Sequence, residues 1–520
     1  MTYRKSARCM PVMAVMIGCV LAGSMRTASG EESGGRRLTT PVRHIILFIG
    51  DGMQTAHAVA AGRYLCGSDE GLAFQRFPLR EAVATWDVAT YNHWAEERGE
   101  PSYNQKQILP WLGYNRGEGG QGPAVDRKVD RQAKVEEAYL TAAATDSASA
   151  ATAWSTGFKT DEGNIAWMAG DPADGALTTL AERLRREKGF AIGVVSTVPF
   201  SHATPAAQIS HNTDRDNYAA IAAEILRRFQ PEVVIGGGHP QWVNRYTYLS
   251  EADYAALKAD GLGGAYVFAE RHSGVDGVAG LLAAARTAAV SGRKLCGLFG
   301  GANGNFESPV PVDAPGAPVV TPATTENPLL RDCVSAALTV LSRDKEGFFV
   351  LFEQGDIDWA NHANDFRRMI GTMWDLDQAV RAAVAFIEKP GDDITWADTL
   401  LIVTADHGTG GMRLGEPLGI GELPHQVKAT VTPCPSTYCE KYTYPDGRVS
   451  YASGAHTNEL VPLHAVGSGL NLFTAYEGVW YPGTRIIDNT HLFHILAAAA
   501  GLSHPSSPAT AEAVVGDTLR

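Results

Sequence analysis

The segment around Ser147 has the residue types and spacing of a nucleophile. Ser147 directly follows Asp146, and both precede a run of small residues that ends at Gly157, a pattern typical of a helix. A serine at a helix N-terminus meets unpaired backbone N–H groups and the positive end of the helix dipole, which stabilise an alkoxide and any phosphate attached to it. An ordinary capped helix has the same local pattern, so this interpretation depends on the rest of the chain.

Two apolar runs end where metal ligands follow. Residues 45–49 stop just before Asp51, and residues 400–404 stop just before Asp406 and His407. Both runs are typical of buried parallel strands, which deliver functional side chains at their carboxyl ends. A carboxylate after a strand is often only a helix cap, but an adjacent Asp–His pair suits a metal bound through oxygen and nitrogen.

A third apolar run, residues 348–352, leads to Glu353, Asp358 and His362. If Asp358 opens a helix, Asp358 and His362 are four residues apart and lie on one face, where both can reach a single ion. Glu353 lies nearer the strand end and can address a neighbouring ion. The alternative is that Asp358 caps the helix and His362 is solvated.

The order of these motifs resembles that of the bacterial alkaline phosphatases, from about Arg43 to about Leu502. The motifs that carry the resemblance are Asp51-Gly52, Thr145-Asp146-Ser147-Ala148, His202-Ala203-Thr204-Pro205, Arg215, Glu353 to His362, Asp406-His407 and His456. The resemblance implies two Zn²⁺ and one Mg²⁺ per subunit, held by three ligand sets. These sets are Asp358, His362 and His456; Asp51, Asp406 and His407, with the Ser147 oxygen; and Asp51, Thr204 and Glu353 for Mg²⁺.

The family's chemistry fits these residue types. Imidazole and carboxylate suit zinc, whereas an all-oxygen set suits magnesium. The resemblance implies that Ser147 is phosphorylated and then dephosphorylated by water. It also implies that Arg215 holds two phosphate oxygens, as a planar guanidinium can, and that Asp146 orients Arg215. Without that context, an arginine between two aspartates would be assigned to a surface ion pair.

The expected charge of the site favours monoesters. Three divalent ions contribute about +6 and four carboxylates about −4, while the alkoxide and Arg215 nearly cancel. The remaining charge of roughly +2 complements a dianionic monoester better than a monoanionic diester. We therefore expect an alkaline phosphomonoesterase that chelators inactivate.

Two positions depart from the pattern of some family members. His202 stands where some members have a carboxylate, and Trp359 stands where some have a lysine. Groups behind the ligands tune metal affinity, so these changes bear on how tightly the third ion binds and on whether it is magnesium or zinc. They do not affect the nucleophile.

The ligands are spread over most of the 520 residues and must converge, which predicts one catalytic domain, residues 43–502. Aliphatic runs at 45–49, 191–195, 233–235, 348–352 and 400–403 alternate with helical patterns, such as the one from Met369 to Ile387. This predicts an α/β fold with a mostly parallel central sheet covered by helices on both faces. Insertions are expected at about 86–135 and 408–454, where long segments separate ligand motifs.

The N-terminal 30 residues have the charged, apolar and small-residue regions of an export signal. Their apolar stretch is too short to span a membrane; a lipoprotein signal at Cys19 is the alternative interpretation. We expect residues 31–42 to be a flexible linker and residues 503–520 to be a tail. Loss of the signal removes four cations and no anion, taking the formal charge from −13 to −17. Such a body repels nucleic acid.

The remaining expectations concern cysteines, partners and competing functions. Export permits disulfides; Cys434 with Cys439 suits a short loop, Cys296 with Cys333 is a second candidate pair, and Cys66 would be a free thiol. The export signal implies a periplasmic or extracellular enzyme, whereas a homodimer is implied by the resemblance alone.

A related phosphodiesterase or nucleotide pyrophosphatase is the main alternative function, although it lacks the third ion set that Glu353 and Thr204 supply. A sulfatase lacks support, because no Cys- or Ser-x-Pro-x-Arg pattern occupies the nucleophile position. A phosphate-binding protein without catalysis is a third possibility, which the intact Ser147 and Arg215 oppose.

Overall fold

The computed structural model describes residues 41–122, 135–244, 246–391, 393–430 and 440–502. The predicted signal, the C-terminal tail and the Cys434–Cys439 pair lie outside these residues. None of the described helices combines the length and apolar character needed to cross a bilayer.

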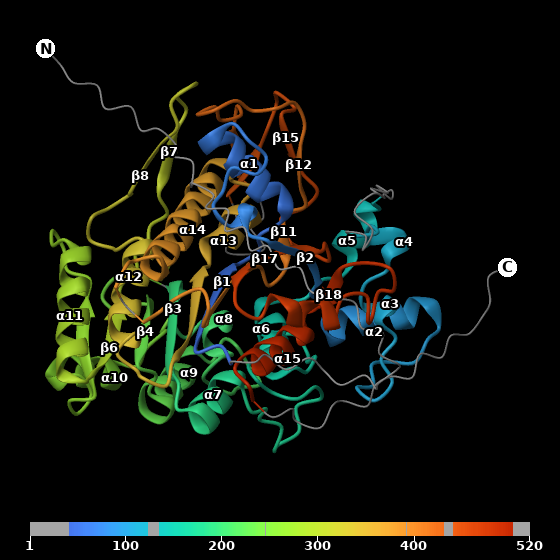
Figure 1. Cartoon of the computed structure of the whole chain (residues 1–520). Coiled ribbons are helices and arrows are strands. Elements are labelled where there is room, and N and C mark those ends of the chain that lie inside the picture. The colour runs from blue at the N-terminus through green and yellow to red at the C-terminus, as the bar shows by residue number, and fades with distance from the viewer. Residues whose placement is uncertain (1–40, 123–134, 245, 392, 431–439, 503–520) are drawn as a thin grey trace, which may run out of the picture. The chain divides into compact units, whose positions relative to one another are not determined.

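A ten-stranded sheet forms the centre of the fold (Figure 1). In spatial order its strands are β18 (Ile486–Asp488), β2 (Leu79–Ala84), β17 (Val461–Gly467), β10 (Thr399–Thr404), β1 (His44–Gly50), β9 (Phe348–Gln354), β3 (Ala191–Pro199), β4 (Val233–Gly237), β6 (Lys294–Leu298) and β5 (Tyr266–Glu270). Neighbouring strands are parallel except where β17 pairs with β10 and β2. The predicted mostly parallel sheet is thus confirmed, and each of the five predicted strand runs lies within one of its strands.

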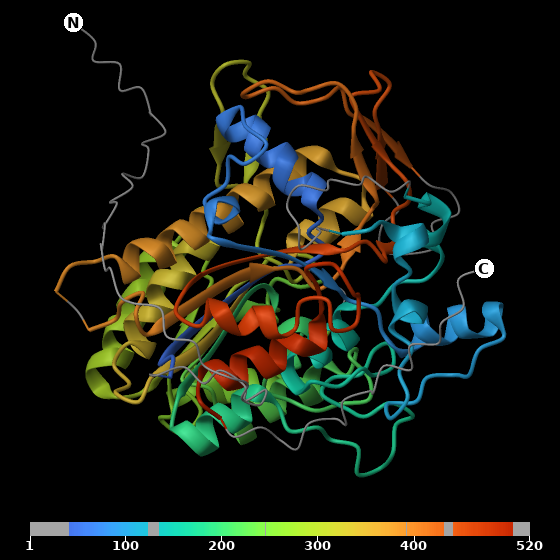
Figure 2. The same ribbon diagram turned by 45° about the vertical axis from the view of Figure 1, so that its right-hand side comes forward.

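Helices cover both faces of the sheet (Figure 2). On one face lie α1 (Thr55–Cys66), α11 (Gly277–Ser291), α12 (Leu330–Leu341), α13 (Asp356–His362) and α14 (Phe366–Ile387); on the other lie α6 (Ser147–Thr156), α7 (Leu180–Lys188), α8 (Ala203–Ala206) and α15 (Asn489–Ala499). The central strands are buried along their whole length, because a parallel strand packed between two helical layers has no solvent-facing side. The helix predicted from Met369 to Ile387 is the C-terminal part of α14.

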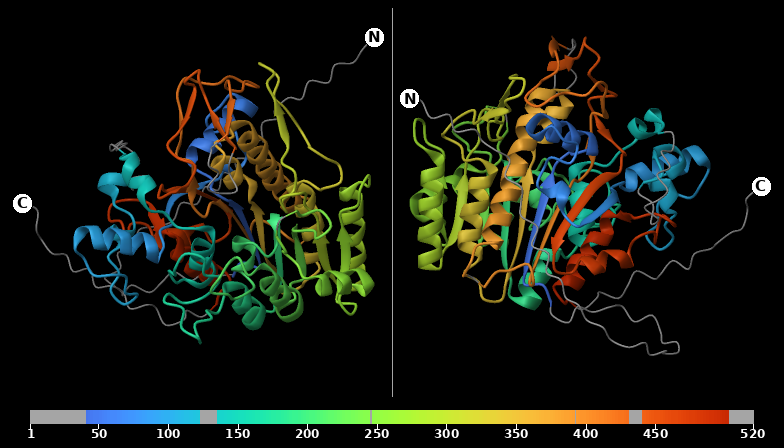
Figure 3. Two further views of the ribbon diagram at one scale, coloured as in Figure 1. Left: turned by 180° about the vertical axis from the view of Figure 1, so that it is seen from behind. Right: turned by 45° about the horizontal axis from the view of Figure 1, so that its top comes forward.

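The first predicted insertion has a small aromatic core of its own. Its helices are α2 (Val88–Arg98), α3 (Pro110–Gly113) and α4 (Arg116–Gly119), with α5 (Glu137–Ala142) directly after it. Trp86, Tyr91, Trp94 and Tyr114 pack together there with Tyr481 near the C-terminal end of the fold. Figure 3 shows these blue and cyan helices beside the red C-terminal segment in both views. The polar composition of this segment did not reveal the core, because a few large rings are enough to bury much apolar area.

The second predicted insertion consists of short two-stranded sheets. These are β11 (Gly408–Thr409) with β16 (His456–Thr457), β12 (Met412–Leu414) with β15 (Val449–Tyr451), and β13 (Val427–Thr430) with β14 (Glu440–Thr443). A further hairpin, β7 (Val310–Val312) with β8 (Val319–Thr321), lies elsewhere in the chain. The β11–β16 pair matters for the site, because it joins the segment after His407 to His456.

The remaining elements complete the covering layers and turns. They are η1 (Phe74–Arg76), α9 (Tyr218–Ala223), the π-helical η2 (Glu224–Phe229), α10 (Glu251–Asp260) and η3 (Leu470–Ala475).

The candidate Cys296–Cys333 disulfide is wrong. Cys296 lies in β6 and Cys333 in α12, and both are buried free thiols. Burial raises the pKa of the Cys296 thiol above its usual range, as expected for a cysteine that acts as a small apolar side chain.

Candidate active site

Four adjacent strands bring the predicted ligands to one edge of the sheet. The strands β10, β1, β9 and β3 are neighbours, and their carboxyl ends lead to Asp406, Asp51, Glu353 and the Thr204 segment. In register, Glu353 lies beside Ile49 of β1 and Ser196 of β3. Parallel strands place such ends together without any requirement for closeness in sequence.

Ser147 is the first residue of α6, as predicted. Asp146 is the N-cap, and its Oδ1 accepts the backbone N–H of Ser149 at 2.9 Å. Ser147 is buried, only 4% exposed, and its Oγ lies 3.2 Å from Nε2 of His407. The hydroxyl therefore combines a helix N-terminus with an imidazole nitrogen, two groups that favour loss of its proton.

The same imidazole nitrogen faces two carboxylates. His407 Nε2 lies 3.2 Å from Asp406 Oδ2 and 3.7 Å from Asp51 Oδ1. Both of these oxygens are buried and have no hydrogen-bond partner, a state that proteins avoid unless another ligand satisfies the atom. Ser147, Asp51 and Asp406, three members of the predicted second site, thus each have an oxygen within 3.7 Å of the same nitrogen, that of the fourth member, His407.

A second group contains Asp358, His362 and His456. The Nε2 atoms of His362 and His456 lie 3.2 Å apart, and they lie 3.1 and 3.6 Å, respectively, from the two Asp358 oxygens. The other ring nitrogen, Nδ1, faces a backbone carbonyl in each case, that of Gly454 at 2.8 Å and that of Thr145 at 2.9 Å. A carbonyl only accepts, so each Nδ1 carries the proton and each Nε2 can offer a lone pair.

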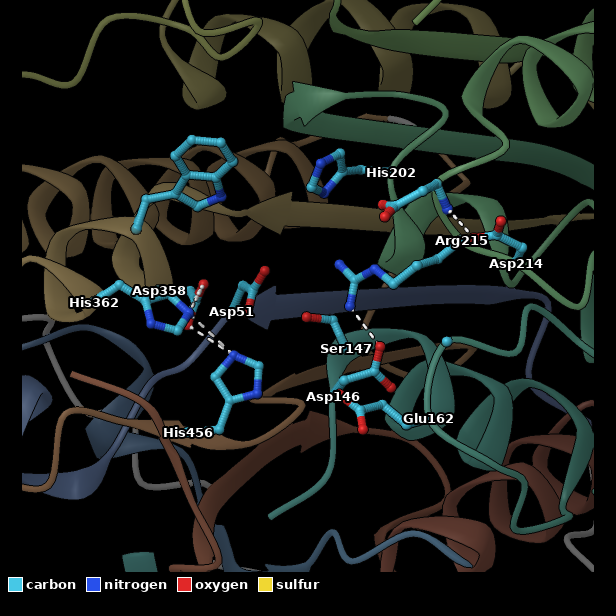
Figure 4. Close-up of a pocket in the computed structure, with 13 residues that line it drawn as sticks. Asp51, Asp146, Ser147, Glu162, His202, Asp214, Arg215, Asp358, His362 and His456 are labelled. Carbon is cyan, nitrogen blue, oxygen red and sulfur yellow. Dashed lines mark hydrogen bonds and ion pairs between the residues drawn. The ribbon is translucent and has the colours of Figure 1, made fainter. Parts of the chain in front are cut away.

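The two groups are contiguous. Ligand atoms of Asp51, Asp358 and His407 lie within 4.8 Å of one another, as do those of Asp358, His362 and His456. Thr409 bridges them, because its hydroxyl donates to Asp358 Oδ1 at 2.5 Å and lies 3.3 Å from His407 Nδ1. Figure 4 shows Asp358, His362 and His456 on the side of the site beyond Asp51.

A tight turn of the chain makes this closeness possible. Gly52, directly after Asp51, has φ +69°, and an added Cβ would lie 2.6 Å from Thr409 Oγ1 and 2.9 Å from Asp358 Cα. Its backbone N–H donates to Asp406 Oδ1 at 2.9 Å. Glycine is required there both for the left-handed backbone and for the space.

The oxygen-rich third set is the least closely defined. Glu353 is buried and accepts a hydrogen bond from Ser196 at 2.5 Å, and the Thr204 hydroxyl, in α8, is buried close enough to Glu353 to affect its pKa. Burial raises the pKa of Glu353 to about 8. The pKa of Asp51 is raised well above its usual range by burial and by the neighbouring carboxylates of Asp406, Asp358 and Glu353. A cation among these acids would keep them ionised, so the donor chemistry fits a metal.

Arg215 pairs with a distant partner, not with its neighbours in sequence. Its Nη1 donates to Asp146 Oδ2 at 2.6 Å, and Figure 4 shows the guanidinium reaching towards Ser147. Although burial alone would raise the pKa of Asp146, Arg215 and Ser149 lower it to about 2. The predicted orientation of Arg215 by Asp146 therefore has the required contact.

A cavity of about 430 Å³ is bordered by part of this site, namely Asp51, Asp146, Ser147, Arg215, Asp358, His362 and His456. The predicted ligands Thr204, Glu353, Asp406 and His407 are not among its lining residues. His202 and Trp359, the two positions that depart from the family pattern, also line it. Burial lowers the pKa of His202 to about 3, with a smaller contribution from Arg215, so this ring is neutral over the physiological range. Three acids that sequence analysis did not assign to the site complete the lining: Glu162, Asp214 and Asp216.

A sequence signal existed for two of these three acids. Asp214 and Asp216 flank Arg215 directly, so whatever places Arg215 in the cavity also places them near it. No local feature singled out Glu162, which follows α6 by a loop.

A buried serine at a helix N-terminus, an arginine beside it, and contiguous oxygen and nitrogen ligands define a metal-dependent hydrolase of phosphate esters. A family model described as alkaline phosphatase matches residues 121–456, more than half of the chain. The chain belongs to the alkaline phosphatase family, and its reaction is the hydrolysis of phosphate monoesters.

Individual relatives agree with this assignment. The chain is 28% identical to the alkaline phosphatase of Escherichia fergusonii, over 93% of this chain and 91% of that protein. The alkaline phosphatase of Thermus thermophilus has the same fold, with a TM-score of 0.57, 22% identity and coverage of 90% of this chain and 93% of that one. A variant of the TAB5 alkaline phosphatase, solved with Mg bound in its M3 site, gives a TM-score of 0.55, 20% identity and coverage of 89% and 99%.

Proposed function

We propose that the chain hydrolyses phosphate monoesters through a phosphoserine at Ser147, releasing an alcohol and then inorganic phosphate. One observation carries this proposal: the Ser147 hydroxyl and the unpartnered oxygens of Asp51 and Asp406 all lie within 3.7 Å of Nε2 of His407. The helix dipole at α6 favours the negative charge that develops on the Ser147 oxygen. Arg215, held by Asp146, binds two non-bridging oxygens of the phosphate.

We propose two Zn²⁺ and one Mg²⁺ as the cofactors. The zinc sets are Asp358, His362 and His456, and Asp51, Asp406 and His407; the magnesium set is Asp51, Thr204 and Glu353. When bound, these ions supply positive charge that stabilises the oxygens gaining negative charge during displacement at phosphorus. The unpartnered carboxylate oxygens and the Nδ1–H orientation of His362 and His456 support this assignment, and so does Mg in the M3 site of the TAB5 variant.

The protein's own side chains fix the geometry. The Thr409 hydroxyl and the backbone carbonyls of Thr145 and Gly454 hold the ligand rings and Asp358 in one orientation. His202 and Trp359 give the cavity a rigid aromatic wall, with ring centroids 6.2 Å apart.

A phosphodiesterase or nucleotide pyrophosphatase remains the alternative. Such an enzyme accepts a substrate with one negative charge fewer at phosphorus and lacks the third ligand set. Burial of both Glu353 and Thr204 beside the other ligands argues against it.

The test uses Ser147→Ala, with Ser155→Ala on the same helix as the matched control. The enzyme is assayed on p-nitrophenyl phosphate and bis(p-nitrophenyl) phosphate, and labelled phosphate is trapped on the protein by acid quench. We expect a monoester preference on the order of 10³-fold or more, and loss of both turnover and trapped label in Ser147→Ala alone. Comparable diester turnover would establish the alternative, and label in Ser147→Ala would exclude Ser147 as the nucleophile.

We also propose that the protein is exported to the periplasm or outside the cell and acts as a homodimer. The composition of residues 1–30 supports export. N-terminal sequencing of the secreted protein tests the cleavage, and sedimentation equilibrium tests the dimer. A mature chain that begins at Met1, or a monomer at micromolar concentration, would contradict the respective proposal.

A further inference from the structure

Ser149 lies two residues after the nucleophile, but it does not line the cavity. It stands in the first turn of α6 and is only 1% exposed. Its hydroxyl lies 2.6 Å from Asp146 Oδ1, 2.8 Å from Thr145 Oγ1 and 3.2 Å from Asp87 Oδ2. A buried hydroxyl with three side-chain oxygens around it is fixed in place, although it binds neither the substrate nor a metal in the proposed reaction.

The two oxygens of the Asp146 carboxylate have different partners. Oδ1 accepts the backbone N–H of Ser149 at 2.9 Å and the hydroxyl of the same residue at 2.6 Å, whereas Oδ2 accepts from Arg215 Nη1 at 2.6 Å (Figure 4). A carboxylate oxygen accepts through two lone pairs, so Ser149 occupies both lone pairs of Oδ1. The guanidinium of Arg215 therefore meets Oδ2.

The Ser149 hydroxyl has one proton, and the distances indicate which oxygen receives it. Asp146 Oδ1, at 2.6 Å, is nearer than Asp87 Oδ2 or the backbone carbonyl of Asp146, both at 3.2 Å. A hydrogen bond to an ionised carboxylate is also stronger than one to a neutral carbonyl. The backbone N–H alone would leave the Asp146 carboxylate free to turn about a single hydrogen bond, so the added bond from the hydroxyl fixes its plane.

Asp87 supports this hydroxyl from the first insertion. It is the N-cap of α2, where its Oδ1 accepts the backbone N–H of Thr90 at 2.7 Å, and it is 1% exposed. Its other oxygen, Oδ2, is the one that faces Ser149. The helix that carries the nucleophile and the first insertion are thus joined at Ser149, because the serine belongs to α6 and the aspartate caps α2.

From this arrangement we propose that Ser149 is a positioning residue for the reaction: its hydroxyl fixes the Asp146 carboxylate so that Oδ2 holds the Arg215 guanidinium against the phosphate. Asp87 in turn holds the hydroxyl in place. The proposal rests on the function proposed above, and it extends the phosphate site to two residues that do not line the cavity. The alternative is that Ser149 only stabilises the start of α6, as a serine near a helix N-terminus can do through local hydrogen bonds.

The test uses Ser149→Ala, with Ser155→Ala as the matched control. Alanine is the best helix former, so α6 should remain intact in both. Ser155 is also buried in α6, but its hydroxyl donates to a backbone carbonyl, that of Thr152, at 3.3 Å. Asp87→Ser keeps a good N-cap for α2 but is too short to reach Ser149, whereas Asp87→Asn keeps both the cap and the contact. The zinc- and magnesium-loaded proteins are compared in kcat/KM on p-nitrophenyl phosphate, in the Kd of inorganic phosphate measured by calorimetry, and in melting temperature.

We expect Ser149→Ala to lower kcat/KM about tenfold and to raise the Kd of phosphate to a similar extent, as the loss of one hydrogen bond to a charged group would. Asp87→Ser should lower kcat/KM about threefold, because the contact that it removes is longer. Asp87→Asn and Ser155→Ala should stay within about twofold of wild type. Adding Ser149→Ala to Asp146→Asn should cost little further activity, because the charge that the hydroxyl orients is already gone, whereas a purely structural serine would give additive losses.

A kcat/KM of Ser149→Ala close to that of wild type would overturn the proposal. Losses that add to those of Asp146→Asn, or that Ser155→Ala reproduces, would also overturn it and assign Ser149 a structural role. An unchanged kcat/KM in Asp87→Ser would exclude Asp87 from the positioning. Failure of the proposed function looks different, because the wild type would then not turn over p-nitrophenyl phosphate. The Kd of phosphate would still report on Arg215 in that case, so the two failures can be told apart.

Discussion

The contact between Asp146 and Arg215 gives a sharp prediction for Asp146→Asn. Asparagine keeps the shape of the side chain and remains a good N-cap for α6, so the helix that carries Ser147 should stay in place. What is lost is the negative charge 2.6 Å from Arg215 Nη1. Without it, the guanidinium is free to leave the orientation in which it meets the phosphate.

The expected magnitude follows from the kind of bond removed. A hydrogen bond between charged groups contributes about 1.5–3 kcal/mol. If that free energy serves to orient Arg215 in the transition state, kcat/KM for a phosphomonoester falls by about 10- to 150-fold. Because Arg215 and Ser149 lower the pKa of Asp146 to about 2, the carboxylate is ionised throughout the working range, and the loss should not depend on pH between about 6 and 10.

The assay is a pH series of kcat/KM on p-nitrophenyl phosphate, with thermal melting of the same samples. Asp253→Asn is the control, because it breaks an ion pair of similar length, 2.5 Å to Arg227, far from the cavity lining. A double-mutant cycle with Arg215→Lys separates the pairwise contribution from other effects. We expect the two substitutions to be strongly non-additive, with Asp253→Asn leaving kcat/KM unchanged.

Three results would refute this reasoning. The first is a kcat/KM within twofold of wild type in Asp146→Asn. The second is additive losses in the double variant, which would mean that Asp146 does not act through Arg215. The third is a drop in melting temperature large enough to account for the lost activity, which would assign Asp146 a structural role at the helix terminus.

Three further predictions concern stability. Chelation should lower the melting temperature as well as abolish turnover, because buried acids such as Asp51 lose their counter-charge. Zinc and magnesium added back should restore both the melting temperature and the turnover. An unchanged melting curve would argue against metal at these carboxylates. Glu182 and Glu224 raise the pKa of His211 to about 9, although burial opposes them. The stabilisation of the fold by these two pairs is therefore complete below about pH 6.5 and disappears as the pH rises through about 9. In His211→Gln the melting temperature should no longer change between about pH 6.5 and 9, and melting temperatures that run parallel to those of the wild type would contradict the assignment. Gly347→Ala should lower the free energy of unfolding by about 2 kcal/mol or more, as measured by urea unfolding. Gly347 has φ +131°, and the added methyl group would lie 2.0 Å from a backbone carbonyl oxygen. An unchanged urea midpoint would show that the chain relaxes around the methyl group.

The candidate site was largely predictable because its ligands stand where regular elements end. Asp51, Glu353 and Asp406 follow or close apolar runs, and Ser147 opens a helix of small residues, so local patterns mark all four. The predicted helix start at Asp358 was less accurate, because α13 begins two residues earlier, at Asp356. The four-residue spacing to His362 survives this shift, because both residues remain within one helix.

Other features had no local pattern to reveal them. The aspartates beside Arg215 would by themselves indicate a surface ion pair; only the resemblance in motif order pointed to its pairing with Asp146, 69 residues away in sequence. Likewise, the polar composition of residues 86–135 did not reveal an aromatic core that packs against Tyr481 and Ile486. In both cases the deciding contact joins segments that are distant along the chain.

The sequence by itself determined which chemistry is available and which elements carry it. Apolar runs with period and length typical of buried strands place carboxylates at strand ends, and small residues after an aspartate begin a helix at the nucleophile; both effects are local. Only the tertiary structure decided which oxygens meet which nitrogens, and that Glu162, Asp214 and Asp216 border the same cavity as Ser147. Those outcomes depend on how strands order themselves in the sheet and how loops pack across its edge, where burial and charge act between residues that no spacing in sequence relates.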